Sequence, residues 1–164
     1  MSEFMNSKKI KPSGHIIFDH DGTLVKTDGI PYILFTGMRE LLVDLKSKGF
    51  ELYIWTARPR NSVLEIVKNL DIAKFFTNIY CYDDGLPKPN PLGLQVLTEG
   101  LDKNEIIHIG DSMTDIDGAK TYGIEVIAAC WNNPNQVENY KGIAHYTALS
   151  LIQCRDIIKG KFNV

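Results

Sequence analysis

Short apolar runs alternate with amphipathic stretches along this chain of 164 residues. The apolar runs are rich in β-branched and aromatic residues, which is typical of buried strands. They cover residues 16–18, 50–55, 79–82, 105–109 and 125–129. Between them, apolar residues recur at helical spacing, as in Met38, Leu41, Leu42 and Leu45, which predicts helices with one buried face. Strands that alternate with helices predict an α/β fold with a mostly parallel sheet of about five to six strands and helices on both faces.

Turn and capping residues separate these elements. Thr36 is predicted to cap a helix that closes at Gly49, and Pro59 suits the first turn of the next helix. Further helices are predicted to start near residue 90, to run to about residue 122, and to run from about 149 to 159, with an edge strand near 145–147. Residues 26–35 are too few for a domain and contain the turn signal Asp28-Gly29, so they predict a small flap over the end of the first strand.

Polar residues follow four of the predicted strands. They are Asp19 and Asp21 after the first, Thr56 after the second, Lys88 in the loop after the third, and Asp111 and Asp115 after the fourth. In an open α/β sheet the carboxyl ends of parallel strands meet at one edge, where ligands bind. Alternation along a strand predicts that the side chains of Asp19 and Asp21 point the same way and that of His20 the other way. Clustered carboxylate oxygens suit Mg²⁺, so we expect a cation site at this edge.

These side chains suit phosphoryl chemistry. A lysine and Mg²⁺ neutralise a phosphate dianion, one carboxylate attacks phosphorus to give an aspartyl-phosphate, and a second carboxylate transfers protons. The sequence has no Walker-type loop, no Gly-x-Gly-x-x-Gly after the first strand, and no Ser or Cys at a strand end beside a base. The pattern therefore argues against nucleotide cradling of those kinds and against a nucleophilic triad.

Composition limits the partners and the cellular compartment that we expect for this protein. The formal net charge of -2 gives no basic footprint for nucleic acid. No apolar run reaches membrane-spanning length and no secretory signal opens the sequence, so we expect a cytoplasmic protein. Cys81, Cys130 and Cys154 lack metal-binding spacing and are expected to be free thiols. Residues 1–13 are expected to form a flexible tail, and residues 14–164 a single domain.

The motifs at the strand ends resemble, in kind and in order, those of the haloacid dehalogenase-like (HAD) phosphatases. The Asp-x-Asp-x-Thr motif of that family is matched by Asp19, Asp21 and Thr23, its strand-end Ser/Thr by Thr56, its loop lysine by Lys88, and its Gly-Asp-x-x-x-Asp motif by residues 110–115. The resemblance covers residues 14–130 and implies a three-layer Rossmann-like HAD fold and a Mg²⁺-dependent phosphatase. The residues around Lys88 and Asp111 further resemble the phosphoglycolate phosphatase-like branch.

The resemblance also implies a role for each matched residue. Asp19 is the implied nucleophile and a metal ligand, and Asp21 the implied general acid and base, with its backbone carbonyl on the metal. Asp111 is an implied metal ligand, and Asp115 either binds the metal directly or orients the ligands around it. The phosphoryl group is implied to meet Thr56, Lys88 and the backbone N–H groups of His20 and Ala57. Arg58 meets either substrate or solvent.

Relatives in this family often insert a cap domain at one of two places. Here 24–35 is too short for a cap, and 58–87 is filled by one predicted helix and one strand, so the chain resembles a capless member. A cap normally supplies specificity and excludes water, which leaves the substrate open. We expect a phosphorylated small molecule such as a sugar phosphate, with a macromolecular phosphate as the alternative.

The remaining alternatives concern the flap and the reaction. The apolar flap 30–35 either folds onto its own core or forms a homo-oligomer contact in which a neighbouring subunit serves as a lid. The fold is also compatible with a non-catalytic binding protein, and with a phosphotransferase that passes the aspartyl-phosphate to an acceptor other than water. No membrane or nucleic-acid partner is expected.

Overall fold

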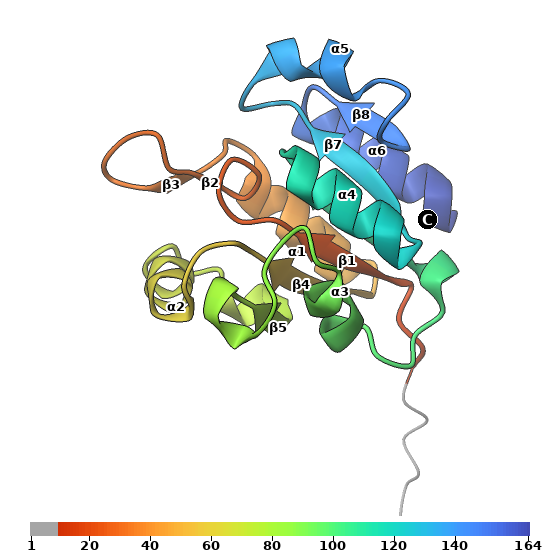
Figure 1. Cartoon of the computed structure of the whole chain (residues 1–164), viewed down its shortest axis with the longest axis horizontal. Helices are drawn as coiled ribbons and strands as arrows, with labels where there is room; N and C mark the ends of the chain where they lie inside the picture. Colours follow the sequence, from red (N-terminus) through yellow and green to blue (C-terminus); the bar gives the residue numbers. More distant parts are fainter. Residues whose placement is uncertain (1–9) are drawn as a thin grey trace, which may run out of the picture.

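The structure is a computed structural model that describes residues 10–164, so residues 1–9 of the predicted tail lie outside the described residues. A six-stranded sheet in the order β5-β4-β1-β6-β7-β8 runs through the middle of the molecule (Figure 1). Its strands are β1 Gly14–Phe18, β4 Phe50–Trp55, β5 Phe76–Tyr80, β6 Ile106–Gly110, β7 Glu125–Ala129 and β8 Tyr146–Ala148. Every neighbouring pair is parallel, which confirms the predicted α/β fold.

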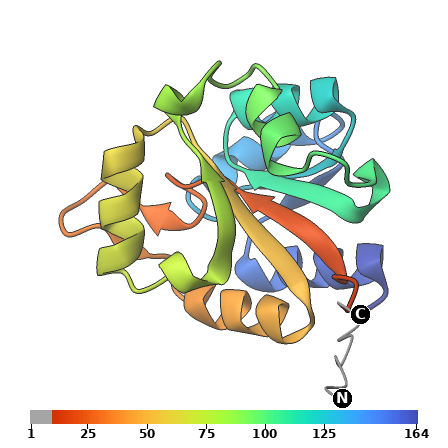
Figure 2. The same ribbon diagram turned by 90° about the horizontal axis from the view of Figure 1, so that it is seen from below.

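Helices cover both faces of this sheet. They are α1 Met38–Ser47, α2 Arg60–Asn69, α3 Leu92–Leu97, α4 Met113–Tyr122, α5 Val137–Tyr140 and α6 Leu151–Phe162. Short 3-10 helices cover Ala73–Phe75, Tyr82–Asp84, Lys103–Glu105 and Pro134–Gln136. One apolar core forms beneath α1, α2 and α6 and a second beneath α3, α4 and α5. Figure 2 shows the resulting three layers, with α1 and α6 below the sheet and α3 and α4 above it.

The predicted flap is a hairpin of two short antiparallel strands, β2 Val25–Lys26 and β3 Ile33–Leu34. Its base is buried through Leu24 and Val25, whereas Ile30 at its tip is 97% exposed. Among residues 10–164, only this hairpin and α1 lie between β1 and β4, and only α2, β5 and two 3-10 helices lie between β4 and Lys88. The described chain therefore contains no cap domain, as the sequence predicts.

Two local predictions are wrong. Thr36 does not cap α1: the N-cap is Gly37, which adopts the left-handed conformation at φ 87°, and no side chain caps this helix end. Glycine reaches this conformation without a Cβ clash, so the chain turns into the helix one residue later than predicted. The third strand covers Phe76–Tyr80 rather than 79–82, because residues Tyr82–Asp84 turn into a 3-10 helix.

Other expectations hold. The spacing of Met38, Leu41, Leu42 and Leu45 places all four side chains in the core beneath α1. Cys81, Cys130 and Cys154 are free, as predicted, and all three are buried. No helix within residues 10–164 combines the length and the apolar character that crossing a membrane requires.

Candidate active site

The site begins where β1 ends. Strand β1 closes at Phe18, and the Asp19 N–H donates to the carbonyl of Ile109 at 2.8 Å, which extends the pairing with β6 by one residue. The chain then turns sharply, because the carbonyl of His20 accepts the N–H groups of Leu24 and Val25, each at 3.0 Å. The turn leaves Asp19 buried at the carboxyl end of the central strand, which is where parallel sheets bind ligands.

Gly22 makes this turn fit the neighbouring loop. It lies at φ 77°, in the left-handed region, and a Cβ there would stand 2.1 Å from Oδ2 of Asp111. Glycine suits this position for two reasons. Any side chain would strain the backbone at this φ, and its Cβ would collide with the Asp111 carboxylate. The close approach brings the loop after β6 against the turn after β1.

The alternation predicted for Asp19, His20 and Asp21 is wrong, because the strand ends at Phe18 and the next residues belong to the turn. The side chains of His20 and Asp21 contact each other, with His20 Nδ1 at 2.8 Å from Asp21 Oδ1. The Nε of Arg58 lies 3.0 and 3.1 Å from the two Asp21 oxygens. Burial opposes ionisation of Asp21, but the hydrogen bonds from His20 and Arg58 lower its pKa. The Asp21 side chain is thus turned toward Arg58.

An acidic cluster forms from three other positions. Asp19, Asp111 and Asp115 each offer a carboxylate oxygen, and these three atoms lie within 4.8 Å of one another. Asp111 follows β6, and Asp115 is the third residue of α4, where its Oδ2 accepts hydrogen bonds from the N–H and hydroxyl of Ser112 at 3.2 and 2.8 Å. The helix start therefore fixes Asp115 in the cluster.

Lys88 reaches this cluster from the loop after β5. Its Nζ lies 2.8 Å from Asp19 Oδ1 and 2.5 Å from Asp115 Oδ1, with the side chain only 4% exposed. The ammonium also sits 4.7 Å from the centroid of the Trp55 ring, close enough for a cation–π interaction. Trp55 is buried in the core, as predicted, and in addition supports this lysine.

His108 is a member of the site that the sequence did not reveal. Its Nδ1 lies 2.9 Å from the carbonyl oxygen of Ile17, and its Nε2 lies 2.9 Å from Oδ1 of Asp115. Because both partners are acceptors, both hydrogen bonds form only when both ring nitrogens carry a proton. The one signal in the sequence is a polar residue in an otherwise apolar strand, which must find partners when buried.

Thr56 and Ala57 lie at the end of β4, beside β1. Thr56 is buried, and its hydroxyl oxygen accepts the N–H of Arg58 at 3.1 Å. Within residues 10–164, the backbone N–H groups of His20 and Ala57 donate to no protein acceptor. The structure thus leaves these two amides available to an anion at the edge where Asp19 lies.

The charges in the cluster are not balanced by the protein alone. Burial, and then the Asp115 carboxylate, raise the pKa of Asp19, and burial, and then the Asp19 carboxylate, raise the pKa of Asp111 to about 8. Burial also opposes the charge of Asp115, but Lys88 and His108 hold the pKa of Asp115 well below its usual range. The three carboxylates repel one another unless a cation compensates their charge. Because their oxygens are hard donors, the cluster fits a divalent cation such as Mg²⁺.

Comparison with known proteins agrees with this geometry. A family model described as haloacid dehalogenase-like hydrolase matches residues 32–129. Phosphoglycolate phosphatase from Shigella boydii is 33% identical over 110 residues, which are 65% of this chain and 43% of that protein. The corresponding enzyme from Escherichia coli K12 is 34% identical over 93 residues, or 55% of this chain and 37% of that protein. The chain therefore spans well under half the length of these relatives.

Solved structures share the fold across most of the chain. A HAD-superfamily hydrolase from Ehrlichia chaffeensis superposes with a TM-score of 0.76 at 18% identity, covering 93% of this chain and 98% of that one. A haloacid dehalogenase-like family hydrolase from Streptococcus pneumoniae gives a TM-score of 0.74 at 22% identity, covering 88% and 98%. At these identities the likeness establishes the fold.

Proposed function

The chain is a member of the haloacid dehalogenase-like hydrolase family, and on that basis we propose that it is a Mg²⁺-dependent phosphomonoesterase that acts through Asp19. The predicted family and its phosphoglycolate phosphatase-like branch are confirmed by the matches above. The observation that carries the proposed activity is the buried Asp19 carboxylate, held by Lys88 at 2.8 Å, with Asp111 and Asp115 within 4.8 Å.

Asp19, Asp111 and the backbone carbonyl of Asp21 are the groups we assign to Mg²⁺. When bound, the ion would neutralise charge on the phosphoryl oxygens and on the attacking carboxylate. Asp115 is better suited to orienting the site than to direct ligation. Its Oδ1 already accepts from Lys88 and His108, and its Oδ2 accepts twice from Ser112, so its acceptor capacity is used within the protein.

The proposed reaction has two steps. A carboxylate oxygen of Asp19 attacks phosphorus, the bond from phosphorus to the ester oxygen breaks, and Asp21 gives its proton to the leaving alkoxide. Asp21 then takes a proton from water, which attacks the aspartyl-phosphate, releases inorganic phosphate and restores Asp19. In the structure Asp21 is a carboxylate paired with Arg58. A phosphate dianion beside Asp21 would oppose its ionisation and so favour the protonated form that the first step needs.

The other predicted residues have matching tasks. The ammonium of Lys88 balances charge on Asp19 and on the phosphoryl group. The Thr56 hydroxyl and the free N–H groups of His20 and Ala57 donate to phosphoryl oxygens. These donors come from the ends of β1 and β4, which are neighbours in the sheet, and this arrangement supports a shared role at one anion.

The substrate is proposed to be a phosphorylated small molecule acted on in the cytoplasm. Residues 10–164 include no cap domain, so within this part of the chain the flap is the element that most resembles a lid. Ile30 is 97% exposed and Ile33 49% exposed, whereas Leu34 and Phe35 pack against the core. The exposed half of the flap therefore suits a contact with a second copy of the chain.

Hydrolysis of p-nitrophenyl phosphate with Mg²⁺ tests the proposed function. We expect turnover that EDTA abolishes and that Asp19→Asn reduces by at least about a thousandfold, since no other carboxylate replaces the nucleophile. Asp117→Asn is the matched control, because Asp117 is exposed on α4 and outside the acidic cluster. Acid quenching should trap a phosphoryl group on the peptide that contains Asp19. Equal turnover of wild type and Asp19→Asn would refute the assignment.

A further inference from the structure

The connection from β7 to β8 starts at the carboxyl edge of the sheet, where the acidic residues lie. Its first part, segment 131–140, consists of a loop, the 3-10 helix Pro134–Gln136 and helix α5 Val137–Tyr140. Trp131 at the start of the segment packs against the core beneath α1, α2 and α6, whereas Tyr140 at its end lies in the core beneath α3, α4 and α5. The segment therefore passes from one face of the sheet to the other.

Each end of segment 131–140 donates a hydrogen bond to one of the two turns that carry the acidic residues. The Nε1–H of Trp131 donates to the carbonyl oxygen of Thr23 at 3.1 Å, in the turn after β1. The hydroxyl of Tyr140 donates to the carbonyl oxygen of Asp111 at 3.2 Å, in the loop after β6. Both acceptors are backbone atoms, so these bonds constrain the path of the main chain in the two turns.

The same two turns contact each other beside this segment. A Cβ built on Gly22 would stand 2.1 Å from Oδ2 of Asp111 and 3.5 Å from Nδ2 of Asn132. The turn after β1, the loop after β6 and the start of the segment thus meet at one point of the carboxyl edge. Thr23 also reaches the acidic cluster directly, because its hydroxyl donates to Oδ2 of Asp19 at 3.4 Å.

We infer that Trp131 and Tyr140 are positioning residues for the metal site, an inference that rests on the function proposed above. Mg²⁺ demands near-ideal geometry from its oxygen ligands, so its affinity depends on how well their separation is fixed before it binds. Asp19 and Asp111 lie on different turns, and segment 131–140 holds one turn through Trp131 and the other through Tyr140. Neither aromatic residue supplies a ligand, and each acts through a backbone carbonyl.

Calorimetric titration of Tyr140→Phe with Mg²⁺ tests this inference. The substitution removes one hydroxyl and keeps the ring in its core, so the fold should be retained. We expect the Kd for Mg²⁺ to rise about threefold to tenfold, which is the range for the loss of one hydrogen bond. The Mg²⁺ concentration that half-saturates turnover of p-nitrophenyl phosphate should rise by the same factor. Turnover at saturating Mg²⁺ should stay within about twofold of wild type, because the bound ion then holds Asp111 in place.

Trp131→Phe removes the other hydrogen bond and should also weaken Mg²⁺ binding by about threefold or more. The two bonds act in series through segment 131–140, so loss of either one already releases the two turns from each other. The variant that combines Trp131→Phe with Tyr140→Phe should therefore raise the Kd by less than the product of the two single effects. Effects that simply multiply would show that the segment does not couple the turns, and would overturn the inference.

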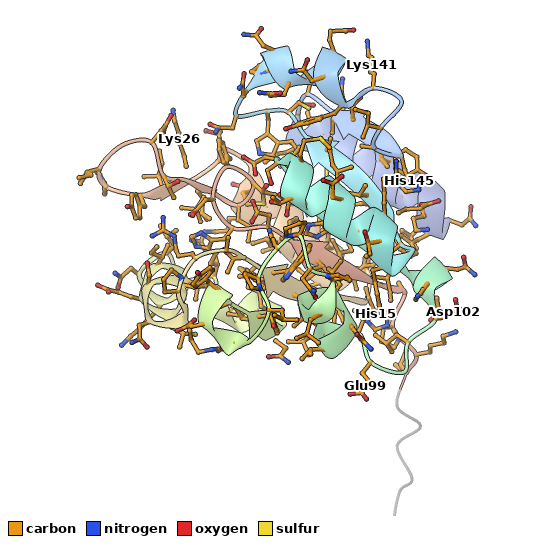
Figure 3. All side chains as sticks on the ribbon, viewed as in Figure 1. His15, Lys26, Glu99, Asp102, Lys141 and His145 are labelled. Carbon is orange, nitrogen blue, oxygen red and sulfur yellow. The ribbon has the colours of Figure 1, made fainter. Side chains whose placement is uncertain are left out.

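Tyr146→Phe is the matched control for Tyr140→Phe. The hydroxyl of Tyr146 donates to Oε2 of Glu125 at 3.2 Å, a bond of equal length at the amino end of β7, which is the opposite edge from the site. Lys141 directly follows Tyr140, is exposed, and lies at the rim of the molecule in Figure 3. Tyr146→Phe and Lys141→Gln should both leave the Kd for Mg²⁺ unchanged.

The possible failures can be told apart. Wild-type affinity for Mg²⁺ in Tyr140→Phe, or equal weakening in Tyr146→Phe, would overturn the inference while Asp19-dependent hydrolysis stands. A loss of stability in urea unfolding without any change in Mg²⁺ affinity would show that Tyr140 is merely structural, and would overturn it as well. A wild-type protein that binds no Mg²⁺ would instead overturn the proposed function and this inference with it.

Discussion

Replacing Lys88 by Met tests how the acidic cluster is held together. The Met side chain keeps most of the length and the packing against Trp55, but it removes the ammonium that bridges Asp19 and Asp115 at 2.8 and 2.5 Å. Three carboxylates whose oxygens lie within 4.8 Å of one another then lie together without the lysine that two of them, Asp19 and Asp115, contact. His108 still contacts Asp115, so Asp115 keeps one partner, whereas Asp19 loses the ammonium that it contacts.

The size of the effect follows from burial. Lys88 is 4% exposed, and Asp19 and Asp115 are 9% and 1% exposed at their side chains. Removing one partner of a buried ion pair lowers the free energy of unfolding by about 3–5 kcal/mol. Part of this loss is offset, because the variant no longer has to desolvate the ammonium when it folds. We expect a loss of about 3 kcal/mol in the free energy of unfolding without metal. For a chain of this size that lowers Tm by about 6–12 °C.

The loss should depend on pH. Lys88 and His108 lower the folded-state pKa of Asp115, so their contribution is present above the unfolded pKa near 3.9 and is lost as the pH falls through the folded value. Burial and the neighbouring carboxylates instead raise the pKa values of Asp19 and Asp111, and removal of Lys88 raises them further. The unfolded chain then ionises before the folded one as pH rises above about 4. Lys88→Met should therefore be less impaired at pH 5 than at pH 8.

Urea unfolding in EDTA at pH 5 and pH 8, followed by circular dichroism, measures these values. Lys68→Met is the control, since Lys68 is exposed on α2, and it should change the free energy of unfolding by less than about 0.5 kcal/mol. Lys88→Met combined with Asp115→Asn should cost less than the sum of the single changes, because the two residues share one interaction. A Lys88→Met protein as stable as wild type at pH 8, or full additivity in the double variant, would contradict this account of the cluster.

Three further predictions address other residues. His108→Phe keeps a ring against Trp55 but removes the hydrogen bond to Asp115, so kcat in a steady-state phosphatase assay should fall about tenfold while KM changes little; an unchanged kcat would remove His108 from the site. Gly22→Ala should lose about 1–3 kcal/mol in urea unfolding and weaken Mg²⁺ binding in calorimetry, because its Cβ would meet Asp111; wild-type values would contradict that. Burial raises the pKa of Cys154 to about 12 and that of Cys81 to about 11, so at pH 8 the thiolate fraction of each is about 0.001 or less. Iodoacetamide should therefore label both thiols slowly until urea unfolds the chain, and rapid labelling of the native protein would refute this.

The periodicity of apolar residues was enough to predict the order of the main strands and helices and the sheet edge where the site forms, although not every boundary. Buried strands and amphipathic helices are specified by the spacing of apolar residues, and this spacing can be read from short stretches of the sequence. Polar residues after the strands identified Asp19, Thr56, Lys88 and Asp111 for the same reason, since a parallel sheet brings its strand ends together. The order β4-β1-β6 adds what the pattern lacks, because it makes Thr56, Asp19 and Asp111 direct neighbours.

Side-chain partnerships were harder to predict, because they depend on where a strand stops and on long-range contacts. The orientation of the Asp21 side chain depends on where β1 ends. The alternation of side chains holds only as far as Phe18, and the turn that begins at His20 places the Asp21 carboxylate against Arg58 rather than in the acidic cluster. His108 and Asp115 are seven residues apart and meet only because β6 and α4 fold back on each other at residues 110–112. Neither contact leaves a periodic signal.

Lys88 shows how packing far from the reacting atoms completes the site. It follows β5, which is separated from β1 by β4, so strand order alone does not bring it to Asp19. The loop reaches the cluster by crossing Trp55, and two glycines allow this. A Cβ on Gly93 would stand 2.2 Å from the Trp55 ring nitrogen, and one on Gly118 would stand 2.4 Å from the far edge of that ring and 3.1 Å from the carbonyl oxygen of Pro89. The indole thus fits between α3 and α4 directly beneath the lysine, so the position of the charge beside Asp19 depends on residues that never contact a phosphate.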